Sequence, residues 1–291
     1  MHECQSMAAI MLIQSIVSPI LRLIRFDKPI GTLLLWCPTA WALWLSNHGS
    51  PPLRLVLIFF LGTFFMRSAG CVLNDIADRN IDRHVARTQH RPLTSGEIRL
   101  QQAFVALFLL LICAFIILLQ LPTACFNYAL GALGLTTIYP FCKRFISAPQ
   151  TILGFAFSMG IPMAYAASDV PLNTTTFLLI LINLMWVIAY DTLYAMVDKA
   201  DDLKIGVKST AILFGQWTHL IIKGLQLGIQ ILWIMIGLLN QLSYLFYIAW
   251  TLGCLVFIAQ QSLMAKQETP DYFKAFLING LYGLLLWGGL I

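Results

Sequence analysis

Apolar runs of about 20 residues recur along the whole of this 291-residue chain, and each is long enough to cross the hydrocarbon core of a bilayer as a helix. The composition agrees: 59% of the residues are hydrophobic and only 11% are charged, whereas a soluble domain carries about 25% charged residues. In lipid, such runs must satisfy their own backbone hydrogen bonds, which helices do. The sequence therefore predicts an all-α, polytopic membrane protein.

Short polar, Pro- or Gly-containing stretches divide the apolar sequence into nine expected spans within a single membrane domain, 1–291. The expected spans are 29–47, 53–74, 101–121, 124–141, 149–168, 174–198, 213–239, 243–262 and 272–290. The apolar stretch from Ala8 to Ile13 lacks the basic region and cleavage site of a signal peptide. We expect it to belong to an amphipathic segment that leads into the first span.

Basic residues are distributed unevenly between the two sides of this arrangement. With the N-terminus in the cytoplasm, 15 of the 18 Lys and Arg residues fall on the cytoplasmic side. The other side keeps only Arg54, while Arg67 and Lys223 fall within spans. Cytoplasmic loops are enriched in Lys and Arg, so the asymmetry supports both the number of spans and their orientation. The net charge of +5 is interpreted as this topology signal and not as a nucleic-acid-binding surface.

An acidic cluster stands where the second expected span meets the cytoplasm. Its acids are Asp75, Asp78 and Asp82, at spacings of three and four residues. On a helix, these spacings place the three carboxylates on one face, and Asn74, four residues before Asp78, joins that face.

A second acidic cluster stands at the cytoplasmic end of the sixth expected span, where Asp191, Tyr194, Asp198 and Asp202 share one helical face. The second and sixth spans end on the same side of the membrane, so the two clusters face the same compartment. Asp191 falls within its span, and an acid inside a membrane is costly and usually functional.

Facing carboxylates repel one another, which raises the free energy of the ionised pair, and a bound divalent cation offsets this repulsion. Mg²⁺ prefers oxygen ligands and completes its coordination with water and substrate phosphate. Two acidic faces are therefore able to hold a metal–diphosphate between them, where the metal offsets charge that develops as a C–O bond breaks. A single such motif is more simply explained as a solvated helix end, but two on one side favour the metal–diphosphate site.

Several basic residues are candidates for binding diphosphate oxygens. Arg87 and Arg91 follow the first acidic cluster, and Lys204 and Lys208 follow the second. Arginine forks suit phosphate oxygens. Ordinary positive charge on the cytoplasmic side explains these residues equally well.

Three further basic residues each have two possible roles, one in substrate binding and one that is not. Lys143 and Arg144 are expected to touch diphosphate or to be topology signals. Arg67 lies seven residues before Asn74 on the same helical face, within a span. It is expected to face a cavity, where it would meet the carboxylate of a small acidic substrate or pair with one of the aspartates.

Segments 74–96 and 190–215 resemble the two signatures of the UbiA family of intramembrane aromatic prenyltransferases. Segments 25–44 and 139–154 are similar to the branch of this family that acts on 4-hydroxybenzoate in bacterial ubiquinone synthesis. The resemblance extends over roughly 22–290. It implies nine transmembrane helices around a central cavity that cytoplasmic loops cap.

The resemblance also implies the reaction. A long polyprenyl group would pass from polyprenyl diphosphate to the carbon of 4-hydroxybenzoate ortho to the hydroxyl and meta to the carboxylate, by Mg²⁺-assisted ionisation and electrophilic aromatic substitution. The enzyme would lie in a bacterial inner membrane, with its N-terminus and active-site loops cytoplasmic. No nucleic acid is expected as a partner.

The expected site residues fall into three groups. The expected metal ligands are Asp75, Asp78, Asp82, Asp198 and Asp202. The expected diphosphate-binding residues are Asn74, Arg87, Arg91, Lys143, Arg144, Lys204 and Lys208. The expected catalytic residues are Asp191, Tyr194 and Arg67. By the resemblance, Asp191 and Tyr194 would line the aromatic pocket or steady the carbocation.

Three alternative functions compete with this interpretation. Relatives that use haem, dihydroxynaphthoate or homogentisate as acceptors are disfavoured by the matches at 25–44 and 190–215. A secondary transporter would have broken helices at the bilayer midplane, whereas most acids here fall at the cytoplasmic boundary. A structural scaffold gives no reason for two acidic motifs on one side.

Overall fold

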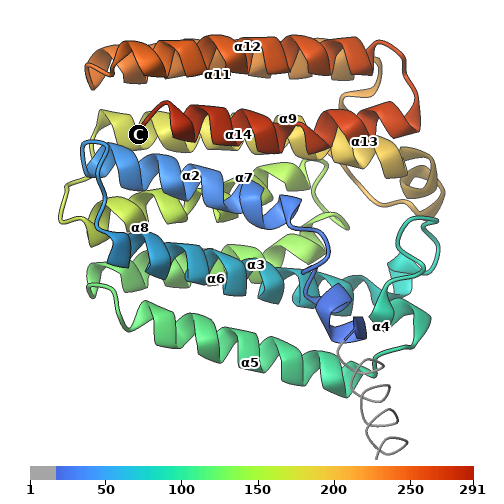
Figure 1. The fold of residues 1–291 in the computed structure, drawn as a ribbon. Coiled ribbons are helices and arrows are strands. Elements are labelled where there is room, and N and C mark those ends of the chain that lie inside the picture. The colour runs from blue at the N-terminus through green and yellow to red at the C-terminus, as the bar shows by residue number, and fades with distance from the viewer. Residues whose placement is uncertain (1–17) are drawn as a thin grey trace, which may run out of the picture.

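The computed structural model describes residues 18–291, and its regular structure consists of helices (Figure 1). The expected amphipathic stretch from Ala8 to Ile13 lies outside the described residues. The helices are α2 (Ile30–Ser46), α3 (Leu53–Asp82), α4 (Pro92–Ser95), α5 (Leu100–Leu118), α6 (Ala124–Cys142), α7 (Pro149–Ser158), α8 (Gly160–Ala167), α9 (Thr174–Ile205), α10 (Thr210–Leu213), the short η1 (Gly215–Trp217), α11 (Thr218–Leu239), α12 (Tyr244–Met264), α13 (Thr269–Leu277) and α14 (Asn279–Gly288).

The long helices lie roughly side by side, with α5 at one edge of the molecule and α11 and α12 at the opposite edge (Figure 1). Five segments of the described chain are long and apolar enough to cross a membrane: α3, α5, α9, α12 and the segment Gly215–Leu239 that contains α11. Helix α2 is apolar but has 17 residues. The chain is a multi-pass membrane protein.

Helices α3 and α9 continue beyond the ends of the spans expected from hydropathy. They contain 30 and 32 residues, which corresponds to about 45 Å or more at 1.5 Å per residue. The hydrocarbon core is only about 30 Å thick, so the last turns of both helices extend past it. Asp75, Asp78 and Asp82 lie on the last turns of α3, and Asp198 and Asp202 lie on the last turns of α9, whereas Asp191 lies about four turns before the end of α9. Helix α9 then ends at Gly206, whose left-handed conformation (φ 78°) caps the helix.

The expected span 149–168 is two helices, α7 and α8, which meet at Met159. Pro162 lies four residues after Ser158, where α7 ends, and has no N–H to donate to the carbonyl of that residue. The hydroxyl of Ser158 also donates a hydrogen bond to the carbonyl of Gly154 (2.8 Å), a contact that often bends helices.

The expected span 272–290 is likewise two helices, α13 and α14, joined at Ile278. The side-chain amide of Asn279 donates hydrogen bonds to the carbonyls of Ala275 and Phe276, both at 3.0 Å. A side chain that inserts into the helical hydrogen-bond ladder interrupts it. The carbonyl oxygen of the same side chain accepts a hydrogen bond from the indole of Trp186 (3.0 Å), which ties the break to α9.

Tight packing of α2, α9 and α14 forms the centre of the core. The indole N–H of Trp41 donates to the carbonyl of Gly283 (3.1 Å), and both Trp41 and Trp186 are fully buried. A Cβ placed on Gly283 would lie 3.0 Å from the Trp186 ring and 3.1 Å from Cβ of Cys37. Small residues at such crossings let membrane helices approach closely.

Gly283→Ala is expected to lower the free energy of unfolding by about 1–3 kcal/mol, because the methyl group overpacks this crossing. Gly288→Ala is the matched control in the same helix, since a Cβ at Gly288 has no neighbour within 4 Å. It should change the free energy by about 1 kcal/mol or less. Unfolding of the purified protein in detergent measures both. Equal effects of the two variants would contradict the packing described here.

Candidate active site

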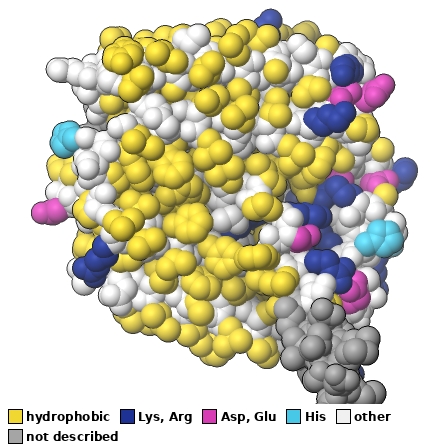
Figure 2. All heavy atoms as spheres, viewed as in Figure 1, with side chains coloured by type: hydrophobic (Ala, Val, Ile, Leu, Met, Phe, Trp, Pro, Cys, Tyr) yellow, Lys and Arg dark blue, Asp and Glu magenta, His cyan; other side chains and the backbone are white. Residues whose placement is uncertain are grey.

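The C-terminal ends of α3 and α9 lie at the same end of the molecule as α4 (Figure 1). Figure 2 shows that Lys, Arg, Asp and Glu side chains gather at this same end, while hydrophobic side chains cover most of the rest of the face in view. The carboxylates of α3 are nevertheless buried: Asp75, Asp78 and Asp82 have relative exposures of 1%, 0% and 4%. Buried carboxylates need charged partners or hydrogen bonds to remain ionised.

Asp75 and Asp82 have basic partners from two other segments, and one of these partners is common to both. One guanidinium nitrogen of Arg25 lies 2.7 and 2.8 Å from the two carboxylate oxygens of Asp75. Arg91 donates to Asp75 at 3.0 Å and to Asp82 at 2.7 Å, so it bridges two carboxylates that lie about two turns apart on α3. Burial by itself would lower the pKa of Arg91, but Asp75 and Asp82 raise that pKa above its ordinary value. The guanidinium therefore stays charged.

Arg87 connects the loop after α3 to the second acidic cluster. Its guanidinium donates to Asp198 at 3.0 and 2.5 Å, and it also donates to the hydroxyl of Tyr194. The guanidinium lies 4.4 Å from the centre of the Tyr194 ring, a cation–π arrangement. Burial acts to lower the pKa of Arg87, and its interactions with Tyr194 and Asp198 outweigh burial and raise it. Arg87 thus ties the loop that follows the first acidic cluster to the second cluster on α9.

Lys143 and Arg144, which follow α6, both contact the end of α3. The ammonium group of Lys143 pairs with Asp78. Arg144 donates to the backbone carbonyl of Ala77 (2.8 Å). The other carboxylate oxygen of Asp78, Oδ1, is buried and has no hydrogen-bond partner among residues 18–291.

A cavity of about 1400 Å³ opens beside this charged cluster. Its charged end contains seven of the residues that the sequence predicted for the site, from both acidic clusters and from the basic residues around them. These are Arg67, Asn74, Asp75, Arg87, Arg91, Asp191 and Tyr194. The remainder is lined mainly by apolar side chains, among them Phe115 of α5, Phe126 and Leu130 of α6 and Phe157 of α7. The cavity therefore combines a polar head with a long apolar chamber.

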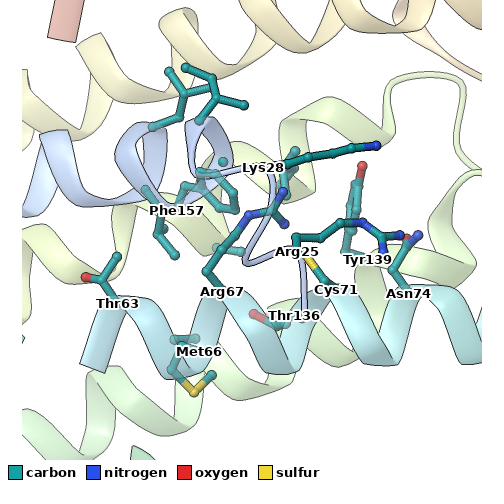
Figure 3. A pocket seen from close by; sticks show the side chains of 18 of the residues that line it. Arg25, Lys28, Thr63, Met66, Arg67, Cys71, Asn74, Thr136, Tyr139 and Phe157 are labelled. Carbon is teal, nitrogen blue, oxygen red and sulfur yellow. The ribbon is translucent and has the colours of Figure 1, made fainter. Parts of the chain in front are cut away.

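Arg67 extends from α3 across this cavity, and Figure 3 shows it close to Lys28 and Arg25. Its Nε is buried and has no hydrogen-bond partner among the described residues. None of the ion pairs within residues 18–291 involves Arg67, so the expected alternative of a pair with an aspartate is not found there.

Eight of the predicted site residues do not line the main cavity. Five of them belong to the charged cluster beside it, namely Asp78, Asp82, Lys143, Arg144 and Asp198, and the other three are Asp202, Lys204 and Lys208. Asp202 and Lys208 line a separate pocket of about 350 Å³. The Lys208 ammonium donates to the carbonyl of Phe145 (2.9 Å). Lys204 is exposed and pairs with Asp201 at 3.3 Å. These residues adjoin the charged cluster but do not line the chamber.

Arg25 and Lys28 line the cavity, although the sequence predicted no more for them than a place among the 15 basic residues on the cytoplasmic side. Arg25 lies 50 residues before its partner Asp75, so no helical spacing connects them. The signal that points to them is their place at the start of segment 25–44, which resembles the family.

The donor set at the charged end fits Mg²⁺, because carboxylate oxygens are the protein ligands that this ion prefers. The unpartnered, buried Oδ1 of Asp78 is an oxygen of that kind. Within the described part of the chain, no three acidic, Cys or His side chains stand together as a ready metal site. The basic side chains pair with the carboxylates instead.

Comparisons with known proteins identify the family. Residues 35–286 match the UbiA prenyltransferase family. A 4-hydroxybenzoate octaprenyltransferase of Legionella pneumophila (strain Paris) is 56% identical over 266 residues, which cover 91% of this chain and 94% of the relative. A 4-hydroxybenzoate octaprenyltransferase of Tolumonas auensis is 51% identical over 273 residues, or 94% of this chain and 96% of the relative. The chain belongs to the UbiA prenyltransferase family.

Solved structures share the fold. A UbiA homolog from Aeropyrum pernix K1 superposes with a TM-score of 0.78 at 23% identity, over 89% of this chain and 96% of that one. A UbiA homolog from Archaeoglobus fulgidus, solved with GPP and Mg²⁺ bound, has a TM-score of 0.67 at 17% identity, over 93% of this chain and 99% of that one. The all-helical architecture described above is the UbiA-like fold.

Arg91→Gln is expected to lower the free energy of unfolding by about 2–4 kcal/mol, because it leaves two buried carboxylates short of a partner. Arg22→Gln is the control, since the Arg22–Glu97 pair is exposed (40% and 39%) and such pairs contribute about 1 kcal/mol or less. Unfolding should be measured in detergent with EDTA present, so that no metal replaces the lost cation. Similar losses in both variants would contradict the importance of the Arg91 bridge.

Proposed function

We propose that the protein transfers a long polyprenyl group from polyprenyl diphosphate to 4-hydroxybenzoate, at the carbon ortho to the hydroxyl and meta to the carboxylate, in ubiquinone biosynthesis. The names and the 56% and 51% identities of the relatives from L. pneumophila and T. auensis support the choice of substrates. The structural observation that carries the proposal is the cavity, whose charged head adjoins both acidic clusters and whose apolar chamber suits a prenyl chain.

The diphosphate belongs at the charged head of this cavity. Arg87 and Arg91 line the cavity, whereas their partners Asp198 and Asp82 do not, so the arginines stand between these carboxylates and the chamber. When the diphosphate arrives, the arginines turn from the carboxylates to phosphate oxygens, which suit their forked geometry. Asn74, Lys143 and the nearby Arg144 complete the set that binds diphosphate, and Lys204 and Lys208 lie at its margin.

The carboxylates that the arginines and Lys143 release are the proposed metal ligands. Asp75, Asp78 and Asp82 of α3 and Asp198 and Asp202 of α9 would hold Mg²⁺ on the two sides of the diphosphate. When bound, Mg²⁺ offsets the charge that develops on the diphosphate as the allylic C–O bond breaks.

The acceptor belongs between the charged head and the apolar chamber. Arg67, which lines the cavity without an anionic partner, binds the carboxylate of 4-hydroxybenzoate. The ring carbon next to the phenol oxygen then attacks the carbocation, and the proton that this carbon carries passes to the departed diphosphate, which restores aromaticity. Tyr194 faces this region, and its ring centre lies 4.8 Å from that of Phe276, so aromatic faces steady the cation while Asp191 adds a nearby carboxyl group.

The apolar chamber protects the reaction from water, which would otherwise capture the carbocation. Exposed side chains on α5 and α6, such as Phe108 and Leu130, give this part of the surface an apolar character that suits lipid. Both the polyprenyl substrate and its product are soluble in the bilayer, so a site inside the membrane gives them direct access.

The proposed topology has nine spans around the cavity, in the inner membrane of a bacterium, with the N-terminus and the charged head in the cytoplasm. Helices α2, α3, α5, α6, α9, α11 and α12 each supply one span, and the pairs α7–α8 and α13–α14 supply the remaining two. The uneven distribution of Lys and Arg supports the orientation.

A prenyl-transfer assay tests the proposal. Purified protein is supplied with radiolabelled 4-hydroxybenzoate and a polyprenyl diphosphate, with Mg²⁺ or with EDTA. We expect lipid-soluble label only with Mg²⁺, and a loss of about 100-fold or more in Asp78→Asn and Asp198→Asn, because each removes a charge that holds the metal–diphosphate.

Asp169→Asn is the matched control for these two variants. Asp169 is exposed in the loop between α8 and α9 and has a positive φ (55°), which asparagine also adopts readily. This variant should retain the wild-type rate. A folded wild-type protein that transfers nothing to 4-hydroxybenzoate would refute the proposed function.

A further inference from the structure

Gly31 lies in the first turn of α2 and lines the cavity opposite Arg67. A Cβ placed on Gly31 would lie 2.5 Å from Nε of Arg67 and 2.8 Å from its Cζ, and closer still to Nη2. Real Cβ atoms are not found this close to other heavy atoms. The guanidinium of Arg67 therefore occupies the space that any other residue at position 31 would fill.

Backbone conformation does not explain this glycine. Gly31 is not one of the described glycines with positive φ, which are Gly49, Gly96, Gly206 and Gly215. The three heavy atoms nearest to the added Cβ all belong to Arg67, so the contact that forbids a side chain is with this guanidinium.

Gly31 differs from Gly280 in the kind of group that an added Cβ would meet. A Cβ on Gly280 would meet the hydrocarbon side chains of Ile30 and Leu33, as expected for packing between α14 and α2. At Gly31, the obstructing group is instead the far end of a long, flexible side chain, which is able to move. An added methyl group would displace the guanidinium and leave the helix packing intact.

The Arg67 guanidinium, which such a methyl group would displace, is a buried cation whose Nε has no hydrogen-bond partner among residues 18–291. Arg67 lines the cavity beside Asp191 and Tyr190, and the hydroxyl of Tyr190, like Nε of Arg67, is buried with no hydrogen-bond partner among residues 18–291. A cation within a membrane span is costly and usually meets a functional partner. An anionic group of the bound acceptor would satisfy these donors.

We propose that Gly31 positions Arg67 to receive the acceptor's carboxylate, and that it thereby sets the preference of the site for an aromatic acid over a neutral phenol. The inference rests on the proposed function, because it assigns the acceptor end of the same site. Gly31 is a positioning residue: it acts through Arg67 and makes no contact of its own with the reacting atoms.

The test compares 4-hydroxybenzoate with its neutral analogue 4-hydroxybenzamide in wild type and in Gly31→Ala. We expect the KM for 4-hydroxybenzoate to rise by about 10-fold or more in the variant, as for loss of a hydrogen bond to a charged group. The preference for the acid over the amide should fall by a similar factor. The KM for polyprenyl diphosphate should stay within about 2-fold of the wild-type value. The thermal midpoint of unfolding should stay within a few degrees of that of the wild type.

Equilibrium dialysis of radiolabelled 4-hydroxybenzoate with the purified protein supplies a readout independent of activity, and should show the same loss of affinity. Gly134→Ala is the matched control, because a Cβ at Gly134 in α6 has no neighbour within 4 Å. It should bind 4-hydroxybenzoate as the wild type does.

A double variant distinguishes positioning of Arg67 from any other effect of the methyl group. Lysine carries a single ammonium group without the planar fork of arginine. In an Arg67→Lys background, Gly31→Ala should therefore change the affinity for 4-hydroxybenzoate by less than about 2-fold. Strong non-additivity of this kind is the signature of two residues that act through one contact.

Two results would overturn the inference while leaving the proposed function intact. One is a Gly31→Ala enzyme that retains the wild-type preference for the acid. The other is a variant that loses affinity for both substrates equally together with thermal stability, which would make Gly31 a packing residue. A wild-type protein that neither binds nor prenylates 4-hydroxybenzoate would refute the inference and the proposed function together.

Discussion

The buried carboxylates at the end of α3 are the constraint on which the rest of this molecule depends. Removing an ionised carboxylate from water costs several kcal/mol unless a partner compensates. The partners come from distant parts of the sequence: Arg25 precedes α2, Arg91 follows α3 and Lys143 follows α6. Arg87 extends the network to Asp198 on α9, 111 residues away. One cluster of charges thus holds four segments together at one end of an otherwise apolar bundle.

The sequence predicted the helical fold because lipid leaves a long apolar run few alternatives. It missed the breaks at Met159 and Ile278, because hydropathy averages over about 20 residues and does not register a single interruption. The break beside Pro162 has a local cause that a closer inspection of the sequence would have found. The break before Asn279 depends on a tertiary contact with Trp186, which the sequence alone does not reveal.

The candidate site was predictable where its residues follow helical spacing. Asp75, Asp78 and Asp82 lie one or two turns apart on a single helix, so their common face follows from the sequence. The partnership of Arg25 with Asp75 and the fit of Arg67 over Gly31 depend on how separate segments meet, which spacing does not report. For the same reason the sequence did not foretell that Asp202 and Lys208 line a pocket of their own.

The central claim is that both acidic clusters serve one diphosphate site, in which Mg²⁺ takes over carboxylates that basic side chains now hold. Calorimetric titration of the purified protein with inorganic pyrophosphate, with Mg²⁺ and with EDTA, tests it most directly. The account predicts binding that requires Mg²⁺ and is lost both in Asp78→Asn on α3 and in Asp198→Asn on α9. Binding of equal strength in EDTA, or loss in only one of the two variants, would contradict it.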